Sequence, residues 1–258
     1  MITCELMGGL GNQLFQIATT TALALRNNDT TFFDIDNHKV SLQGKNAFNY
    51  KSNLYQKLNN CVVNDIEFIF NEKGFQYSEI PYKNNLKIVG YFQSEKYFID
   101  YKNEILELFE PNIDVLTYIN NKYGNILKNK TCSLHVRHGD YLNLSDSHPP
   151  LQLKYYEDAI KYFDNNTLFL VFSDDINWCK TVFKGDNFLF IENEEDYIDL
   201  YLMSLCENNI IANSSFSWWG SWLNKNEDKK VIAPSKWFGL TNNHLKTDDI
   251  YTDKMIKI

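Results

Sequence analysis

The stretch "TCSLHVRHGDYL" (131–142) passes from a buried strand into a polar cluster within a few residues. Leu134 and Val136 are the apolar positions of an alternating pattern, which is typical of a β-strand. Four ionisable side chains follow this pattern around one glycine, Gly139: His135, Arg137, His138 and Asp140. A strand that ends in such a cluster indicates a binding edge rather than a core position.

The alternation of strands and helices continues from this stretch to the C-terminus. Strands are expected at 131–137, 167–173, 187–191, 209–213 and 230–234. Helices are expected at 153–163, 176–183, 195–207 and 216–224. Strands and helices that alternate with short loops predict a parallel sheet covered by helices. We therefore expect one α/β domain over residues 129–258.

The N-terminal half begins in a similar way. A strand at 2–6, a glycine turn at 7–13, a helix at 13–26 and a strand at 30–36 form a βαβ start. Further along, we expect a strand at 86–90 and a helix at 94–111, with Ser94 as its N-cap and Pro111 as its stop. Residues 37–85 carry no readable pattern. We expect a second α/β domain over residues 1–128.

The composition excludes several classes of protein. The chain has 258 residues, 44% of them hydrophobic, and a net charge of −8, which argues against a broad nucleic-acid grip but not against a nucleotide. Five scattered cysteines without CxxC spacing predict buried free thiols. We find neither a signal peptide nor an apolar run long enough to span a bilayer. We therefore expect a cytoplasmic protein with at most peripheral contact with the inner membrane.

Polar residues follow three of the predicted strands, where parallel strands present their carboxyl ends to a ligand. These clusters are "RHGD" (137–140), "SDD" (173–175) and "NSSFS" (213–217). The candidate binding residues among them are Arg137, Asp174, Asp175, Asn213, Ser214, Ser215, Phe216 and Ser217. Arg137 can hold a phosphate with two parallel hydrogen bonds, and the serines can cap a helix or bind phosphate. A structural ion pair between Arg137 and Asp140 is the alternative.

The glycine turn "GGLGNQL" (8–14) allows more than one interpretation. Gly9 and Gly11 resemble a dinucleotide fingerprint, but Leu14 stands where its third glycine belongs, and the Walker lysine is absent. The turn could instead present N–H groups to an anion, with Asn12 as an added donor, or it could be a tight turn alone.

Asp34 and Asp36 could hold a divalent metal ion, although solvated turn residues are the interpretation that we favour. No cluster of His and Cys has zinc spacing.

Taken together, the blocks "GGLGNQLFQ" (8–16), "HVRHGDY" (135–141), "SDDINWCK" (173–180) and "NSSFSWWGSWL" (213–223) resemble the bacterial α-1,2-fucosyltransferases of glycosyltransferase family 11. The resemblance implies a GT-B-type fold, with two Rossmann-like domains facing a cleft: an acceptor-side domain at 1–128 and a GDP-sugar-binding domain at 129–258. It also implies GDP-fucose as donor, a galactose-terminated glycan as acceptor, inversion at the anomeric carbon, and neither a metal nor another cofactor.

The resemblance also implies roles for single residues. Arg137 matches the arginine on the donor's β-phosphate, His135 a histidine near guanine, Asp199 an aspartate that reads guanine, and Asn12 the asparagine facing the reaction centre. Asp140 is a candidate base. The family usually has a second arginine where this chain has His138, so that role is not transferred. A non-catalytic sugar-nucleotide or glycan binder on the same fold, and a nicotinamide enzyme, are the alternatives.

Overall fold

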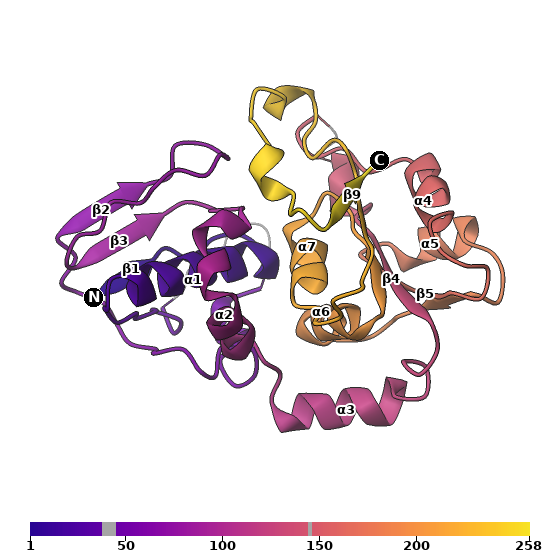
Figure 1. Cartoon of the computed structure of the whole chain (residues 1–258), viewed down its shortest axis with the longest axis horizontal. Coiled ribbons are helices and arrows are strands. Elements are labelled where there is room, and N and C mark those ends of the chain that lie inside the picture. Colours follow the sequence, from indigo (N-terminus) through magenta and orange to yellow (C-terminus); the bar gives the residue numbers. More distant parts are fainter. Residues whose placement is uncertain (38–44, 144–145) are drawn as a thin grey trace. The chain divides into compact units, whose positions relative to one another are not determined.

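The structure is a computed structural model that describes residues 1–37, 45–143 and 146–258, without the side chains of Asp140 and Asn143 (Figure 1). The chain forms two compact units. The first unit contains Met1–Asn112 and Lys246–Thr252, and the second contains Ile113–Leu245 and Asp253–Ile258. The domain boundary expected between residues 128 and 129 stays a prediction.

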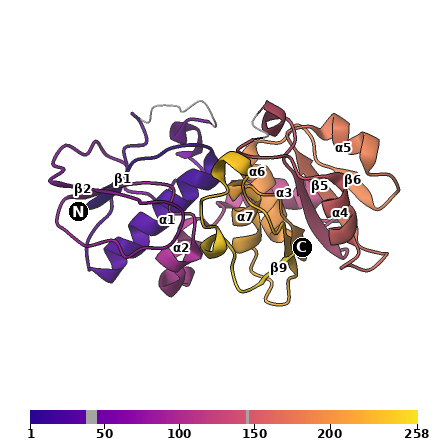
Figure 2. The same cartoon turned by 90° about the horizontal axis from the view of Figure 1, so that it is seen from above.

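The first unit is built on a three-stranded parallel sheet in the order β1-β3-β2. Its strands are β1 (Ile2–Cys4), β2 (Phe68–Asn71) and β3 (Leu86–Val89). Helix α1 (Leu10–Arg26) runs beside β1, and α2 (Lys102–Leu108) belongs to the same unit (Figure 2). The strands expected at 2–6 and 86–90 are thus confirmed.

Helix α1 begins three residues earlier than expected. Gly8 has a φ of +72°, a conformation that glycine adopts without strain, and Gly9 is the N-cap. The amides of Asn12 and Gln13 already donate to the carbonyl of Gly9. The prediction of a turn over 7–13 was therefore too long, because Gly11 and Asn12 lie in the first helical turn.

Two other expectations for the first unit were wrong. Residues 30–36 form no strand among the described residues, but only isolated bridges at Thr31 and Phe33. The amide of Ile35 bonds to the side chain of Asn60 instead of a neighbouring strand. The helix expected at 94–111 divides into two 3-10 turns and α2, because Phe98, whose ring is fully buried, has a non-helical φ of −139°.

The second unit contains a six-stranded parallel sheet in the order β6-β5-β4-β7-β8-β9. Its strands are β4 (Thr131–Val136), β5 (Leu168–Ser173), β6 (Phe188–Phe190), β7 (Asn208–Ile210), β8 (Val231–Ala233) and β9 (Met255–Lys257). Its helices are α3 (Ile113–Tyr123), α4 (Leu153–Ile160), α5 (Ile176–Val182), α6 (Asp196–Leu205) and α7 (Ser215–Trp222). The expected alternation is confirmed, whereas α3, β9 and β2 had no counterpart in the sequence analysis.

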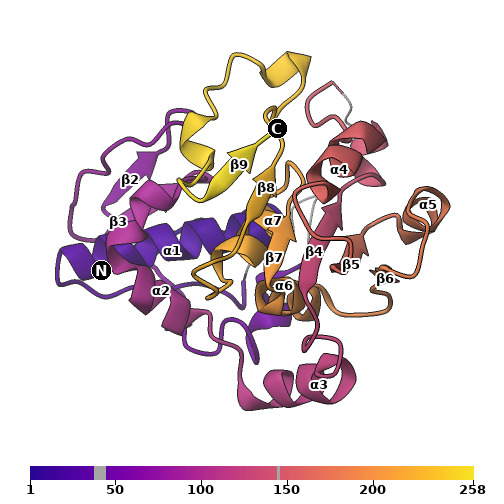
Figure 3. The ribbon, with the colours of Figure 1, turned by 45° about the vertical axis from the view of Figure 1, so that its right-hand side comes forward.

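Strand β4 lies in the middle of this unit, with α4 and α7 on either side of it (Figure 3). All six residues of β4 are buried. Cys132, Leu134 and Val136 join the apolar cluster that includes residues of α4 and α5. On the alternate positions, Ser133 bonds to Asn209 and His135 contacts Phe216. Because neighbouring side chains point to opposite faces of a strand, His135 belongs to the face shared with α7.

Helix α7 is held by close packing. Trp218, Trp219 and Trp222 are buried, and Trp219 packs edge to face against the other two rings. A side chain at Gly220 would lie 2.9 Å from the Cβ of Met203 on α6, so glycine permits the close approach of the two helices. This packing fixes the direction of α7, whose first turn carries several candidate site residues.

Two further expectations concern thiols and membranes. All five cysteines are free, and four are buried, whereas Cys61 is exposed. No described helix has both the length and the apolar character that crossing a bilayer would need.

Candidate functional site

The carboxylate of Asp174, directly after β5, holds the turn that follows β4. Its Oδ1 accepts hydrogen bonds from the backbone amides of His138 (2.9 Å) and Gly139 (3.2 Å). Its Oδ2 lies 3.5 Å from Nε of Arg137. A Cβ at position 139 would lie 3.3 Å from the same oxygen, so glycine gives the carboxylate room. The ends of two neighbouring strands are thus joined by one side chain.

His138 forms the second link between these turns. Its Nδ1 lies 2.9 Å from Oδ2 of Asp175, and its ring stacks on Trp178 at 4.3 Å with an angle of 15°. The hydrogen bond from His138 is the main reason that the pKa of Asp175 lies below its usual range. Asp175 also caps α5 by accepting from the amide of Trp178. His138 therefore fastens the turn after β4 to α5.

Arg137 follows the last residue of β4, so the strand ends one residue earlier than expected. Its guanidinium lies 5.6 Å from the ring centre of Tyr141 and beside Asp174, and its side chain is one-third exposed. Asp174 is the acidic partner that the structure describes. The side chain of Asp140 lies outside the described part, so its expected roles as partner or base stay predictions.

His135 is a buried imidazole at the end of β4. Its exposed fraction is 4%, and its Nδ1 has no hydrogen-bond partner in the part of the chain that the structure describes. Burial lowers the pKa of His135 from 6.5 to about 3, and the nearby charge of Arg137 acts in the same direction. The ring is therefore neutral at physiological pH, and it packs against Phe216 at 5.6 Å.

The segment 213–217 contains the end of the turn after β7 and the first turn of α7. Asn213 donates from Nδ2 to the carbonyls of Pro149 and Trp237, both at 3.1 Å. Ser214 is the N-cap of α7, and Ser217 accepts from the amide of Ala212. The two serines thus stabilise the turn, and the N-terminus of α7, including Ser215 and Phe216, stays beside His135.

A cavity of about 320 Å³ lies at the carboxyl ends of β5 and β6. Its volume is in the range of small-molecule sites. The residues that line it are Ser173, Asp174, Asp175, Ile176, Asn177, Ile191, Glu192, Asn193, Glu194 and Asp199. The structure therefore brings Asp199, which the resemblance assigns to guanine, to the same cavity as Asp174 and Asp175. The segment 191–194 was missed, although it follows a predicted strand.

The cavity is rich in carboxylates, but three of them have a cationic partner. Asp174 lies beside Arg137, whereas Asp175 pairs with the imidazole of His138. Glu192 pairs with Lys180 at 2.6 Å, and Glu194 pairs with Lys122. These partners reduce the negative potential that an anionic ligand would meet.

The predicted residues of the first unit form a separate group. Asn12 accepts a hydrogen bond from Nε2 of Gln93 at 2.9 Å, which brings the end of β3 to the first turn of α1. Gln13 donates to the carbonyl of Gly8, and Gln16 accepts from the amide of Met7. The glycine turn with Gly9 and Gly11 is thus braced by amide side chains that the sequence analysis did not identify.

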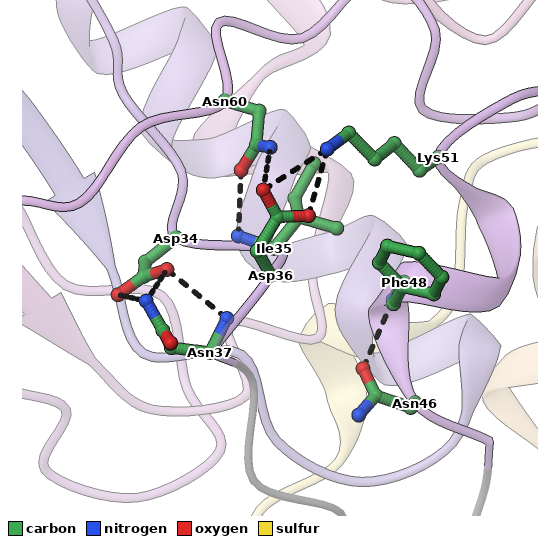
Figure 4. A network of polar contacts seen from close by, with 8 residues as sticks. All are labelled: Asp34, Ile35, Asp36, Asn37, Asn46, Phe48, Lys51 and Asn60. Carbon is green, nitrogen blue, oxygen red and sulfur yellow. Dashed lines mark hydrogen bonds and ion pairs between the residues drawn. The ribbon is translucent and has the colours of Figure 1, made fainter.

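Asp34 and Asp36 have structural partners (Figure 4). Asp34 accepts from the backbone and side-chain nitrogens of Asn37, as a turn residue does. Asp36 pairs with Lys51 at 2.7 Å and accepts from Asn60. Within the described residues, no three His, Cys, Asp or Glu side chains gather as a metal site would require. The interpretation as turn residues is confirmed for Asp34, and Asp36 forms an ion pair.

The buried imidazole of His135 predicts a dependence of stability on pH. Between pH 6.5 and 3 the unfolded chain binds a proton at this position and the folded chain does not. The free energy of unfolding should therefore fall as pH falls through this window, by about 1.4 kcal/mol per pH unit from this group. Urea unfolding at pH 7, 6 and 5 measures it. The His135→Gln variant should lose this part of the slope, and equal slopes for the two proteins would contradict the assignment.

Comparison with known proteins adds independent findings. The family model described as "Glycosyl transferase family 11" matches residues 1–256. Two Escherichia coli proteins are each 33% identical to this chain: the O-antigen biosynthesis glycosyltransferase WbnK, over 96% of this chain and 98% of that protein, and an alpha-1,2-colitosyltransferase, over 100% and 99%.

Solved structures agree in fold. The fucosyltransferase NodZ from Bradyrhizobium superposes with a TM-score of 0.56 at 15% identity, covering 85% of this chain and 92% of that one. A NodZ structure soaked with GDP-fucose gives a TM-score of 0.51 at 15% identity, with coverage of 86% and 92%. These similarities confirm the expected α/β fold of the GT-B type. The match of the family model over residues 1–256 shows that this protein belongs to glycosyltransferase family 11.

Proposed function

We propose that this chain transfers L-fucose from GDP-fucose to a hydroxyl of a galactose-terminated glycan, in α-1,2 linkage and with inversion. The observation that carries the proposal is the cavity at the ends of β5 and β6, bounded by Asp174, which in turn holds Arg137. In parallel α/β sheets this edge is where nucleotides bind. The similarity to an O-antigen transferase supports a surface polysaccharide unit as the acceptor.

The base of the nucleotide would lie in this cavity. Guanine presents an N1–H and an exocyclic amine side by side, and a carboxylate can accept from both. Asp199 is in the first turn of α6 and lines the cavity, so its carboxylate is the acceptor that we assign to guanine. Uracil lacks this pair of donors, and selection of GDP over UDP follows.

The diphosphate would lie beside Arg137. As the bond to fucose breaks, negative charge develops on the leaving diphosphate, and a donor fixed in advance stabilises that charge most effectively. Asp174 holds the arginine in place, and the N-terminus of α7 adds the positive end of its dipole. Ser214, Ser215 and Ser217 belong to this anion-binding turn in the proposal, and His135 and Asn213 complete the donor side.

Asn12, with Gly9 and Gly11, is assigned to the reaction centre from the first unit, and Asp140 to the acceptor hydroxyl as a base. Family membership removes the nicotinamide enzyme as an alternative. A non-catalytic binder differs from the proposed enzyme in one observable, the release of GDP from the sugar nucleotide.

Colitose is the second candidate for the transferred sugar. The similarity to an alpha-1,2-colitosyltransferase, 33% identical over the whole chain, favours it. Colitose is fucose without its 3-hydroxyl, so the two donors share the nucleotide and the leaving group. A protein group that hydrogen-bonds to the 3-hydroxyl of fucose would be left without a partner when colitose binds, and this difference decides which donor is preferred.

The first prediction from the proposed function concerns the donor. We expect GDP to bind and UDP to bind at least tenfold more weakly by calorimetry, because loss of both guanine donors removes paired hydrogen bonds. With a panel of galactosides, GDP-fucose and GDP-colitose should release GDP faster than GDP-mannose does. Equal affinity for GDP and UDP would contradict the assignment of the guanine site. Faster turnover of GDP-colitose than of GDP-fucose would show that colitose is the transferred sugar.

The second prediction concerns metals. Because Arg137 and the N-terminus of α7 are assigned to the leaving diphosphate, transfer should continue at an unchanged rate in excess EDTA. The control is the same assay with added Mn²⁺ or Mg²⁺. A rate that is abolished by EDTA and recovered with either ion would show that the charge on the diphosphate is met by a metal.

The third prediction concerns Arg137 itself. Arg137→Lys keeps the charge but loses the planar pair of donors, so kcat should fall about 100-fold while GDP still binds. The chain has one other arginine, Arg26, which forms an exposed pair with Asp100. Arg26→Lys is the matched control and should leave kcat unchanged. Near-normal turnover of Arg137→Lys would reduce Arg137 to a structural partner of Asp174.

A further inference from the structure

Helix α3 holds one wall of the cavity through a single carboxylate. Glu194, in the segment between β6 and α6, accepts from the hydroxyl of Tyr123 at 2.6 Å and from the hydroxyl of Tyr118 at 3.0 Å. Lys122 donates to the same carboxylate, and also to the hydroxyl of Tyr118 at 3.1 Å. All three donors belong to α3 and all are within six residues of one another. We call Glu194, Tyr118, Lys122 and Tyr123 the α3 clamp.

The clamp has a buried carboxylate at its centre, whereas the side chains of Lys122 and Tyr118 are partly exposed. The side chain of Glu194 is 3% exposed. Burial alone would raise the pKa of Glu194, but the hydrogen bonds from Lys122, Tyr123 and Tyr118 together hold it below its usual range. The carboxylate is therefore ionised at neutral pH, and the hydrogen bonds from the three donors offset the cost of burying its charge.

The carboxylate that α3 holds belongs to the cavity. Glu194 lines it together with Ile191, Glu192 and Asn193, whereas the residues that line it include none from α3. Asn193 has a φ of 61°, so this segment turns sharply immediately before the clamped residue. Helix α3 also packs against α6, which carries Asp199 (Figure 3). The helix thus supports two parts of the cavity wall from behind.

We propose that the α3 clamp fixes the shape of the nucleotide cavity, and that Glu194, Tyr118 and Tyr123 are positioning residues for the donor; this rests on the proposed function of the cavity. A segment held in its binding conformation loses less entropy when the ligand arrives, so the clamp raises affinity. Lys122 in addition neutralises a carboxylate that an anionic nucleotide would otherwise meet. Because the clamp does not contact the reacting atoms, its loss should weaken donor binding and leave the chemical step unchanged.

The test removes two hydroxyls and keeps both rings. In the Tyr118→Phe/Tyr123→Phe variant, the dissociation constant for GDP and the KM for the donor should rise about tenfold, with kcat within about twofold of the wild type. Tyr162→Phe is the matched control, because Tyr162 is an exposed tyrosine outside the clamp. It should change neither constant. Tyr118 is 42% exposed, so Tyr118→Phe alone provides a variant expected to fold if the double variant does not.

Hydrogen exchange on the wild type gives a second measurement without any variant. Linkage is reciprocal, so GDP bound in the cavity should increase the protection of amides in α3, although α3 does not line the cavity. A wild type that does not bind GDP would overturn the proposed function. A wild type that binds GDP, with variants of equal affinity and unchanged protection of α3, would overturn the clamp and leave the proposed function standing.

Discussion

The candidate site depends on the carboxylate of Asp174. It comes at the end of β5 and accepts hydrogen bonds from two backbone amides of the turn after β4, so the carboxyl ends of the neighbouring strands β4 and β5 are tied together. The same side chain meets Arg137 and forms part of the cavity wall. In the proposed reaction Arg137 meets the leaving diphosphate, and a cation with that task is most effective when its position is fixed beforehand. Asp174 supplies that constraint for Arg137, as Asp175 does for His138.

Three of the carboxylates around the cavity are also paired with cationic side chains. In the proposed function, an acidic chain with a net charge of −8 receives an anionic sugar nucleotide in a cavity that is itself lined by carboxylates. Pairing with Arg137, Lys180 and Lys122 reduces the repulsion, while the carboxylate oxygens keep further capacity to accept hydrogen bonds. Such a lining suits a ligand part that donates hydrogen bonds, which a guanine ring does and a phosphate does not.

The strands and helices of the second unit can be predicted from the sequence, whereas the contacts that hold its cavity cannot. Alternating strands and helices identified β4 to β8 and α4 to α7, because each element has its own hydrophobic period. The strand-end rule placed Asp174, Asp175 and Arg137 in one region before any contact was known. The interpretation failed where contacts distant in sequence decide the outcome. Phe98 leaves the helical conformation, and its ring is buried in the core. Glu194 is held by hydrogen bonds from α3, a helix that no local sequence pattern predicted.

In the proposed function, the cavity at the ends of β5 and β6 receives the base of a guanine nucleotide while Arg137 receives its diphosphate. A crystal structure of the protein with GDP decides whether it does. We expect the guanine ring in the cavity, with N1 and the exocyclic amine within hydrogen-bond distance of Asp199, and a phosphate oxygen on the guanidinium of Arg137. Guanine bound elsewhere, with the cavity holding only water, would contradict it.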